Sequence, residues 1–232
     1  MAEIPEIPEI PVTAPRATGA CFVTFEGLDG SGKSSHLRRI GEALARRGRA
    51  ALTTHEPGGT PLGDGLRSLF KDRRFHVTDG TVELLLVFAG RRQHLIEVID
   101  PALSRGEVVL CDRFTDSTYA YQGAGRLVPL ATLEEVDRLA TGSRRPDRTI
   151  LFDLPAAQAR ERGRSRGRRA RGAVDRLDDE DLAFYERVRA GYLDLAAREP
   201  GRVRVVDSGG PLEATAAAVR RALADLLPEV DG

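Results

Sequence analysis

The segment from Gly27 to Ser34 has the clearest chemical signal in the sequence. It fits the pattern G-x-x-x-x-G-K-[ST] at every fixed position and follows the apolar run Cys21–Phe25. Glycines let successive backbone N–H groups point at phosphate oxygens, and the helix that follows offers its N-terminus to the same anion. Lys33 would reach the β- and γ-phosphates, and Ser34 would hold Mg²⁺. A glycine-rich turn that matches by accident is the alternative, but a strand before the segment and a helix after it favour binding of a nucleoside triphosphate.

Asp112 and Arg113 form a second candidate group, directly after the apolar run Val108–Cys111. The carboxyl ends of strands in open α/β sheets are where ligand groups gather. Arg113 suits bidentate binding of an acceptor phosphate, and Asp112 suits a place near Mg²⁺. An ion pair that caps the strand is the alternative. Phosphate loops serve several reaction classes, and a small-molecule kinase needs such a second phosphate site in line with the first.

A third group is the arginine-dense segment from Arg160 to Arg171, which Gly163 and Gly167 interrupt and Gly172 follows. Charge runs are usually solvated faces. Here the glycine spacing adds flexibility, and flexible guanidinium groups suit a mobile cover over phosphates. A nucleic-acid patch is the competing interpretation, but aromatic residues are not interleaved with these arginines.

Alternating strand and helix patterns must position these groups. From Cys21 onward, short β-rich runs alternate with helical patterns, which predicts a parallel sheet with crossover helices. The expected strands are about 21–26, 50–54, 107–112, 148–153 and 202–206. The expected helices are 36–47, 61–70, 81–105, 182–198 and 212–227. Pro101 should kink the long helix or start a new segment. The apolar surplus of that helix fits either a second subunit or ordinary burial.

Length and charge bound the organisation of the chain. Its 232 residues fit one α/β domain, predicted over 20–230 with a lid at about 160–175. Lys plus Arg number 35, as do Asp plus Glu, so a net charge of zero gives no global field to attract nucleic acid or a membrane. Residues 1–19 contain a Glu-Ile-Pro repeat, which predicts a disordered or extended proline-rich tail.

The cysteines and the hydropathy indicate the compartment. Cys21 and Cys111 both lie in apolar runs, which favours reduced core thiols over a disulfide framework. No apolar stretch approaches the ~20 residues of a membrane span, and the N-terminus lacks a signal-peptide pattern. We therefore expect a soluble, cytoplasmic protein.

Short motifs follow one another along the chain, namely GLDGSGKSS at 27–35, HEPGGT at 55–60, LR at 66–67, GRRQ at 90–93, DRF at 112–114, STYAYQG at 117–123, RPD at 145–147 and DR at 175–176. Taken in order, they resemble the motifs of the thymidylate kinase family, whose members phosphorylate dTMP with ATP. The resemblance extends from Phe22 to the last helix, and only the phosphate loop is specific by itself.

The resemblance implies four groups of site residues. Those implied in catalysis are Lys33, Arg113, Arg166 and Asp29. Those implied in binding ATP are Gly27, Leu28, Asp29, Gly30, Ser31, Gly32, Lys33, Ser34, Ser35 and Arg162. Those implied in binding dTMP are Glu56, Pro57, Arg67, Val87, Arg91, Arg113, Thr118, Tyr121 and Gln122. The residues implied in holding the metal are Ser34, Asp112 and Asp29.

Several of these positions have a specific role in the family. Asp29 matches an acidic residue near the 3′-hydroxyl of the nucleotide and the metal region. Arg91 matches the residue that hydrogen-bonds thymine O4, and Thr118 and Gln122 match polar contacts to the N3 edge. Tyr121 would pack on the sugar. Two arginines, Arg67 and Arg113, match contacts to the dTMP phosphate.

The lid resembles that of the bacterial subtype in which the catalytic arginine comes from the lid. The variable positions of the phosphate loop, 28–31, hold no basic residue. The missing positive charge would then come from Arg162 or Arg166. Because the segment is longer than in the family, Arg168, Arg169 and Arg171 are alternatives.

Two positions near the expected acceptor depart from the family pattern. Val87 stands where a phenylalanine usually stacks on thymine, with Phe88 next to it. His55 replaces the arginine that usually precedes Glu-Pro-Gly-Gly-Thr, which removes a positive charge or makes it pH-dependent.

The sequence therefore predicts an α/β P-loop NTPase of the nucleoside monophosphate kinase type, with a five-stranded parallel sheet and a short arginine-rich lid. The expected activity is Mg²⁺- and ATP-dependent phosphorylation of dTMP to dTDP in dTTP synthesis, by a homodimer that binds neither nucleic acid nor membranes. A kinase of another nucleotide or of a deoxynucleoside is the alternative. A non-catalytic nucleotide- or RNA-binding protein is a more remote one.

Overall fold

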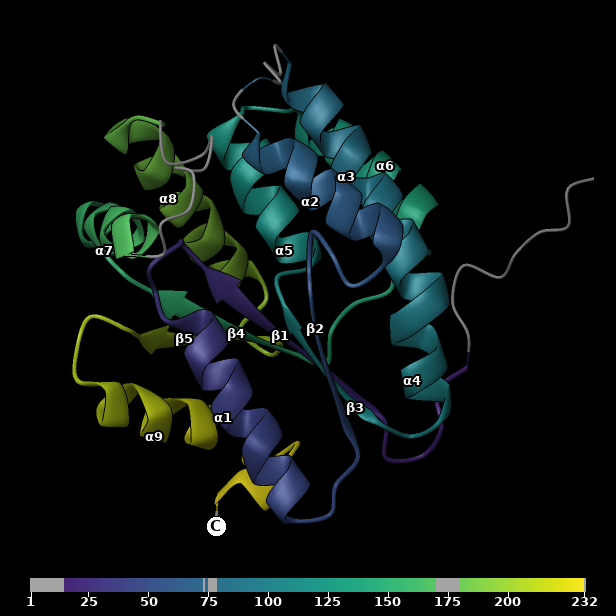
Figure 1. The fold of residues 1–232 in the computed structure, drawn as a ribbon. Coiled ribbons are helices and arrows are strands. Elements are labelled where there is room, and N and C mark those ends of the chain that lie inside the picture. Colours follow the sequence, from purple (N-terminus) through teal and green to yellow (C-terminus); the bar gives the residue numbers. More distant parts are fainter. Residues whose placement is uncertain (1–14, 73, 75–78, 170–179, 232) are drawn as a thin grey trace, which may run out of the picture.

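A five-stranded parallel sheet forms the centre of the computed structural model, which describes residues 15–72, 74, 79–169 and 180–231. The strand order is β2-β3-β1-β4-β5 (Figure 1). The predicted parallel sheet is confirmed, and the predicted strand ranges agree with the observed ones to within one residue at each end. The strands are β1 (Cys21–Gly27), β2 (Ala51–His55), β3 (Val108–Asp112), β4 (Arg148–Asp153) and β5 (Val203–Asp207).

Helices α1 (Lys33–Arg46) and α9 (Leu212–Leu223) cover one face of the sheet. Alternate residues of β1, including Val23 and Phe25, pack there against Leu37, Leu44 and Val219. Period-two alternation in a strand sends the intervening residues of β1 to the other face. The helix predicted to end at Leu227 ends at Leu223, and a short 3₁₀ helix, η4 (Pro228–Asp231), follows.

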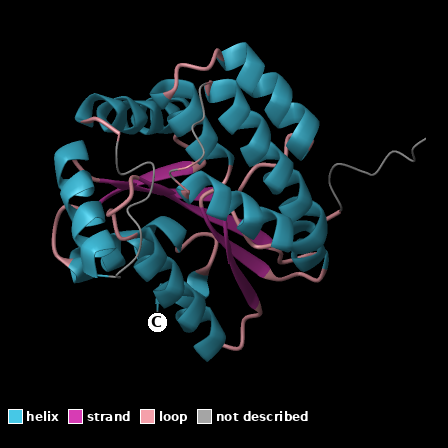
Figure 2. Ribbon diagram, turned by 45° about the horizontal axis from the view of Figure 1, so that its top comes forward, coloured by secondary structure: helices cyan, strands magenta, loops and turns pink. Residues whose placement is uncertain are grey.

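A second set of helices covers the opposite face of the sheet (Figure 2). Phe22 and Val109 pack there against Leu95 and Leu103. Two further helices, α2 (Pro61–Lys71) and α6 (Leu130–Thr141), pack on α3. The covering elements are α3 (Gly80–His94), η1 (Leu95–Ile99), α4 (Asp100–Ser104), α5 (Thr115–Thr118), η2 (Tyr119–Gly125) and α8 (Leu182–Arg198).

The long helix predicted over 81–105 is three consecutive segments. Its α-helical part ends at His94, a π-helical turn spans Leu95–Ile99, and α4 begins at Asp100. Pro101 occupies the first turn of α4, and the helix change predicted near this residue, a kink or a new segment, is the π-helical turn just before it. Five helical segments among the described residues were not predicted, namely α5, η2, α6, α7 (Ala156–Arg169) and η4.

The first part of the arginine segment is helical. Gly163 and Gly167 lie inside α7, so the glycines in this stretch do not end the helix before Arg169. A glycine costs only about 1 kcal/mol in a helix interior, which neighbouring arginines with good helix propensity can offset. The rest of the predicted lid, 170–175, lies outside the described residues.

Residues 15–19, which the sequence predicts as the end of a disordered or extended tail, contact the domain through Arg16. Arg16 Nη1 donates to both carboxylate oxygens of Asp147, at 2.7 and 2.6 Å. Asp147 in turn accepts a hydrogen bond from the backbone N–H of Phe22 at 2.7 Å. Local composition gave no sign of this contact because the partner lies 131 residues away in the chain.

In the part of the chain that the structure describes, no helix combines the length and the apolar character needed to cross a membrane.

Candidate nucleotide-binding site

A cavity of about 500 Å³ opens at the carboxyl ends of β1, β2 and β3. Most of the polar residues that line this cavity were predicted from the sequence to bind ATP, the acceptor or the metal. Parallel strands bring their following loops to the same edge of a sheet, which explains how segments far apart in sequence meet here. The lining residues are Asp29, Gly30, Gly32, Lys33, Ser34, Leu37, Arg38, Thr53, Thr54, His55, Glu56, Arg67, Asp112 and Arg113.

The phosphate loop has the backbone geometry of an anion site. Gly30 and Gly32 have φ values of +92°, in the left-handed region that glycine adopts without strain. α1 begins at Lys33 with no side-chain cap at its N-terminus. Because the first N–H groups of a helix need an acceptor, this end of α1 is suited to a phosphate.

Lys33 is folded beneath the loop. Its Nζ donates to the carbonyl of Leu28 at 3.1 Å and lies 3.8 Å from Asp29 Oδ1. Burial lowers the Lys33 pKa, Arg113 lowers it further, and Asp29 opposes both. The Leu28 side chain is buried in the core, so Leu28 offers its backbone rather than its side chain to the site. Ser31 is also buried, whereas Ser35 is exposed.

Ser34 and Asp112 meet at the floor of the site. The Ser34 hydroxyl donates to Asp112 Oδ2 at 2.5 Å. Within the described residues, no cluster of three or more His, Cys, Asp or Glu is arranged to hold a metal alone. A hydroxyl beside a carboxylate nevertheless fits Mg²⁺, which takes one or two protein oxygens and completes its shell with phosphates and water.

Arg113 is fixed by several partners at the end of β3. Its φ is +74°, a conformation that is strained for a residue with a side chain. Nη2 donates to Asp29 at 2.8 Å and to the Tyr121 hydroxyl at 3.2 Å. Nη1 donates to the hydroxyls of Ser117 at 3.0 Å and Tyr192 at 3.2 Å. The structure therefore unites three residues predicted in the site, Asp29, Arg113 and Tyr121.

Glu26 lies beneath this arginine and was missed by sequence analysis. The buried carboxylate accepts hydrogen bonds from the Phe114 N–H at 2.7 Å, Ser117 Oγ at 2.5 Å and Tyr192 OH at 2.9 Å. Burial, reinforced by the charge of Asp116, raises the pKa of Glu26 to about 7. A glutamate inside a mostly apolar strand was the available sequence signal. Tyr192, on the distant helix α8, left none.

A second buried network holds the predicted base-reading arginine. Arg91 donates through Nε to Glu56 at 2.7 Å, through Nη1 to Thr118 Oγ1 at 2.9 Å, and through Nη2 to the Phe114 carbonyl at 3.0 Å. His94 Nδ1 lies 2.9 Å from the other Glu56 oxygen. Burial tends to raise the Glu56 pKa, but Arg91 and His94 outweigh it, so the pKa is lowered.

Gln122, which was predicted to contact the acceptor base, is held by Glu83. Its Nε2 donates to Glu83 Oε2 at 3.1 Å, and both side chains are buried. Val87 lies between Glu83 and Arg91 on α3 and is partly exposed. Phe88 is buried in the core, with the Arg91 guanidinium 4.7 Å from its ring centroid. The aromatic ring next to Val87 therefore belongs to the core.

The residues around the predicted acceptor phosphate lie at the mouth of the cavity. Arg67 donates to the Pro57 carbonyl at 3.1 Å. His55 Nε2 is 3.8 Å from Asp64. Burial and the charge of Arg67 lower the His55 pKa. A lowered pKa favours the neutral form of the His55 imidazole.

Among the predicted lid arginines, Arg162 is described and does not line the cavity. Arg162 donates to the carbonyls of Ser208 at 3.1 Å and Gly209 at 3.4 Å, in the loop after β5. The side chains of Arg166, Arg168 and Arg169, like the whole of Arg171, lie outside what the structure describes.

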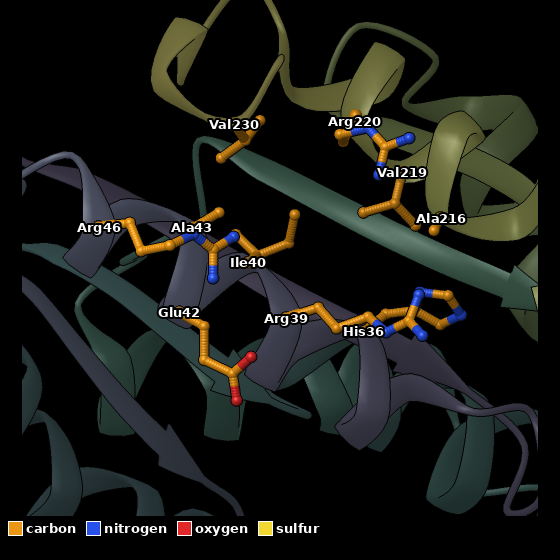
Figure 3. A pocket seen from close by; sticks show the side chains of 10 residues that line it. All are labelled: His36, Arg39, Ile40, Glu42, Ala43, Arg46, Ala216, Val219, Arg220 and Val230. Atoms are coloured by element: carbon orange, nitrogen blue, oxygen red, sulfur yellow. The ribbon is translucent and has the colours of Figure 1, made fainter. Parts of the chain in front are cut away.

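A second cavity, of about 490 Å³, lies between α1 and α9 and shares no lining residue with the first. Figure 3 shows the arginines Arg39 and Arg46 of α1 and Arg220 of α9 around it. Ile40 and Val219 contribute an apolar part of the lining. None of these residues was predicted as a site residue.

A phosphate loop that faces an arginine-rich acceptor pocket across one cavity defines a P-loop phosphotransferase that acts on a phosphorylated acceptor. Comparison with known proteins gives the family. The family model "Thymidylate kinase" matches residues 25–219, and the chain belongs to the thymidylate kinase family. The predicted family and fold class are therefore confirmed.

Individual members of the family align with this chain over nearly their whole length. Thymidylate kinase of Teredinibacter turnerae is 46% identical over 87% of this chain and 96% of its own. That of Pseudomonas putida is 46% identical over 90% of this chain and 97% of its own. The crystal structure of thymidylate kinase from Ehrlichia chaffeensis has a TM-score of 0.68 at 30% identity, and the match covers 88% of this chain and 98% of that one.

Proposed function

We propose that this chain transfers the γ-phosphoryl group of ATP to dTMP and forms dTDP. The observation that carries the proposal is the position of Arg113. Its guanidinium, pinned by Asp29 and by the hydroxyls of Ser117, Tyr121 and Tyr192, adjoins the phosphate loop in one cavity. Membership of the thymidylate kinase family supports dTMP as the acceptor.

The proposed chemistry is electrostatic positioning. The loop amides and Lys33 hold the donor phosphates, while Arg113 and Arg67 grip the acceptor phosphate. A phosphate oxygen is already nucleophilic, so the site needs no general base. Holding acceptor and donor in line accounts for much of the acceleration.

Mg²⁺ fits the oxygen donors of Ser34 and Asp112, with Asp29 nearby. When bound, the metal would neutralise charge on the donor phosphates. The residues themselves orient the loop, because the Ser34 hydroxyl ties α1 to the end of β3.

The base would be read between α3 and η2. We assign Arg91 to thymine O4 and Thr118 and Gln122 to the N3 edge, because the Arg91–Thr118 and Glu83–Gln122 contacts join these two elements. Tyr121, which receives a hydrogen bond from Arg113, would border the sugar. Glu56 would act by holding Arg91.

A panel of acceptors tests the proposal. Steady-state phosphorylation by ATP would be measured for dTMP, dUMP, dCMP, dGMP and thymidine. The highest kcat/KM is expected for dTMP, because its base edge and its doubly charged phosphate both have partners in the site. A preference for thymidine would indicate a deoxynucleoside kinase, and a preference for another nucleotide would overturn the acceptor assignment. ATP binding without transfer to any acceptor would indicate the non-catalytic alternative.

The lid arginine remains assigned to Arg166, with Arg162 at the donor nucleotide. Both positions lie on α7, one helical turn apart. Arg166→Ala should lower kcat more than it raises KM for dTMP. Unchanged turnover would move the role to Arg162 or to another lid arginine.

The assembly that we propose is a homodimer in the cytoplasm that binds neither nucleic acid nor membranes. Val82, Leu85 and Ile96 are exposed apolar residues at helical spacing along α3 and η1, which suits a second subunit. Cys21 and Cys111 are both buried free thiols, which supports a reducing compartment.

A further inference from the structure

Glu83 is a buried carboxylate with no place in the chemistry described above. Its side chain is 2% exposed in the first turn of α3. Arg126 contacts both of its oxygens, through Nε to Oε2 at 3.2 Å and through Nη2 to Oε1 at 3.2 Å. A carboxylate paired with a guanidinium in this way is an acceptor only, so any further partner must donate to it.

The further partner is Gln122. A glutamine amide can present either its NH₂ group or its carbonyl oxygen to a neighbour, and nothing in the side chain itself decides which. Glu83 decides, because Oε2 can only accept and lies 3.1 Å from Gln122 Nε2. The amide oxygen is thereby turned away from Glu83. Among the described residues, that oxygen has no hydrogen-bond partner, so it is available to a ligand.

Glu83 and Gln122 lie beside the residues that we assign to the acceptor base. Glu83, Val87 and Arg91 follow one another at four-residue intervals on α3, and therefore lie on one face of the helix. Thr118 and Gln122 are also four residues apart on the facing segment. The Arg91–Thr118 contact joins the two elements at one end, and the Glu83–Gln122 contact joins them at the other. Val87, a partly exposed small side chain, lies between the two contacts.

We propose that Glu83 is a positioning residue for base specificity: it fixes the Gln122 amide so that its oxygen accepts a hydrogen bond from N3–H of the acceptor base. Thymine and uracil carry a hydrogen on N3, whereas cytosine has a lone pair there. A fixed acceptor therefore favours the first two bases and repels the third. The inference rests on the proposed function, because it requires a pyrimidine nucleotide in this pocket.

The test compares kcat/KM for dTMP, dUMP and dCMP in the wild type and in Glu83→Gln. The substitution keeps the shape but supplies a donor, so the Gln122 amide is free to turn over. Loss of one neutral hydrogen bond costs about tenfold, so the preference for dTMP over dCMP should fall by about tenfold. The preference for dTMP over dUMP should not change, because both bases have N3–H.

Glu97→Gln is the matched control, because Glu97 accepts a hydrogen bond from Gln93 further along the same helical stretch. It should leave all three kcat/KM values unchanged. Gln122→Met, which removes the acceptor, should lower the dTMP:dCMP preference by about tenfold whether or not the Glu83 variant folds. Adding Glu83→Gln to Gln122→Met should then change the preference no further.

Two results would overturn the inference while the proposed function stands. In the first, the wild type prefers dTMP, but Glu83→Gln or Gln122→Met has the same dTMP:dCMP preference as the wild type. The other is an equal loss for all three acceptors in Glu83→Gln, which is what a purely structural role produces. A wild type that does not phosphorylate dTMP would instead refute the proposed function.

Discussion

At the scale of single residues, the site depends on charged groups that are buried with their partners. Arg113 has a strained backbone, and its neighbours come from the phosphate loop, from η2 and from α8. A strained residue persists only where its surroundings over-determine it. Glu26 contributes to this by binding the Phe114 N–H and the Ser117 hydroxyl, on either side of the turn that follows Arg113.

We predict that Glu26 makes the protein less stable as pH rises. Its pKa is about 7 in the folded protein, above the ordinary value of 4.5, so the folded state binds this proton more tightly than the unfolded state. The stabilisation is complete below about pH 4.5 and is lost as pH rises through about 7. Relative to Glu26→Gln, the wild-type free energy of unfolding should fall by about 2–3 kcal/mol between about pH 5 and pH 8.

Urea unfolding of both proteins at the two pH values measures this difference. Glu42→Gln, at an exposed position on α1, is the control and should follow the wild type. If the curves of wild type and Glu26→Gln stay parallel across the range, the carboxyl does not titrate there and the expectation is wrong.

Lys33→Met should lower kcat by at least about a hundredfold, because it removes the positive charge at the donor phosphates. It should not lower the melting temperature, since the buried ammonium is already desolvated and its pKa is lowered by burial. Lys71→Met, at the exposed end of α2, should change neither quantity. Wild-type turnover in Lys33→Met would remove this lysine from the mechanism.

At the scale of elements, the phosphate loop and the lid helix pack directly on each other. A Cβ at Gly30 would lie 2.5 Å from the Ala159 carbonyl and 3.0 Å from Arg162 Cβ, both on α7. The loop and the first turns of α7 are therefore placed by a backbone contact that only glycine permits. This contact ties the donor site to the helix that carries Arg162 and Arg166.

Gly30→Ala should therefore displace α7 and destabilise the protein by about 1–3 kcal/mol. Turnover should fall by about tenfold to a hundredfold, because the lid arginines are then misplaced. Gly65→Ala is the contrasting variant: Gly65 lies inside α2 with nothing within 4 Å of an added Cβ, so it should stabilise by about 0.5–1 kcal/mol. Chemical denaturation and steady-state kinetics measure both, and a fully active, stable Gly30→Ala would contradict the proposed contact.

The sequence predicted the elements whose pattern is local. The strands, the phosphate loop and the position of Asp112 and Arg113 follow from periodicity and motif, because each is specified within a short window. The π-helical η2 was not predictable in this way, since its stability comes from packing against α8 rather than from propensity. The partners of Arg113 could not be predicted from a local pattern either, because Tyr192 is 79 residues away and contacts Arg113 only in the folded chain.

At the scale of the whole molecule, the exposed apolar residues on α3 and η1 predict a homodimer. Val82 is 46%, Leu85 54% and Ile96 37% exposed, so three apolar side chains of one helical stretch face the solvent in the single chain. Sedimentation should give twice the 25.2 kDa mass of the chain for the wild type. Leu85→Glu should give the single-chain mass, because a charge in an apolar interface cannot be solvated.

Leu139→Glu is the control for this experiment. Leu139 is 74% exposed but lies on α6, so its substitution should leave the dimer intact. A wild-type protein that sediments as a single chain at micromolar concentration would show that α3 is an ordinary solvent-facing helix.

The contact of Arg16 with Asp147 fixes the edge at which the chain enters the fold. Arg16, Asp147 and the start of β1 all lie at the amino ends of the strands, whereas the phosphate loop and Arg113 lie at the carboxyl ends. The contact that holds residues 15–19 and the loops that line the nucleotide-binding cavity therefore lie at opposite ends of the strands, so a substitution at Arg16 acts far from the phosphate loop.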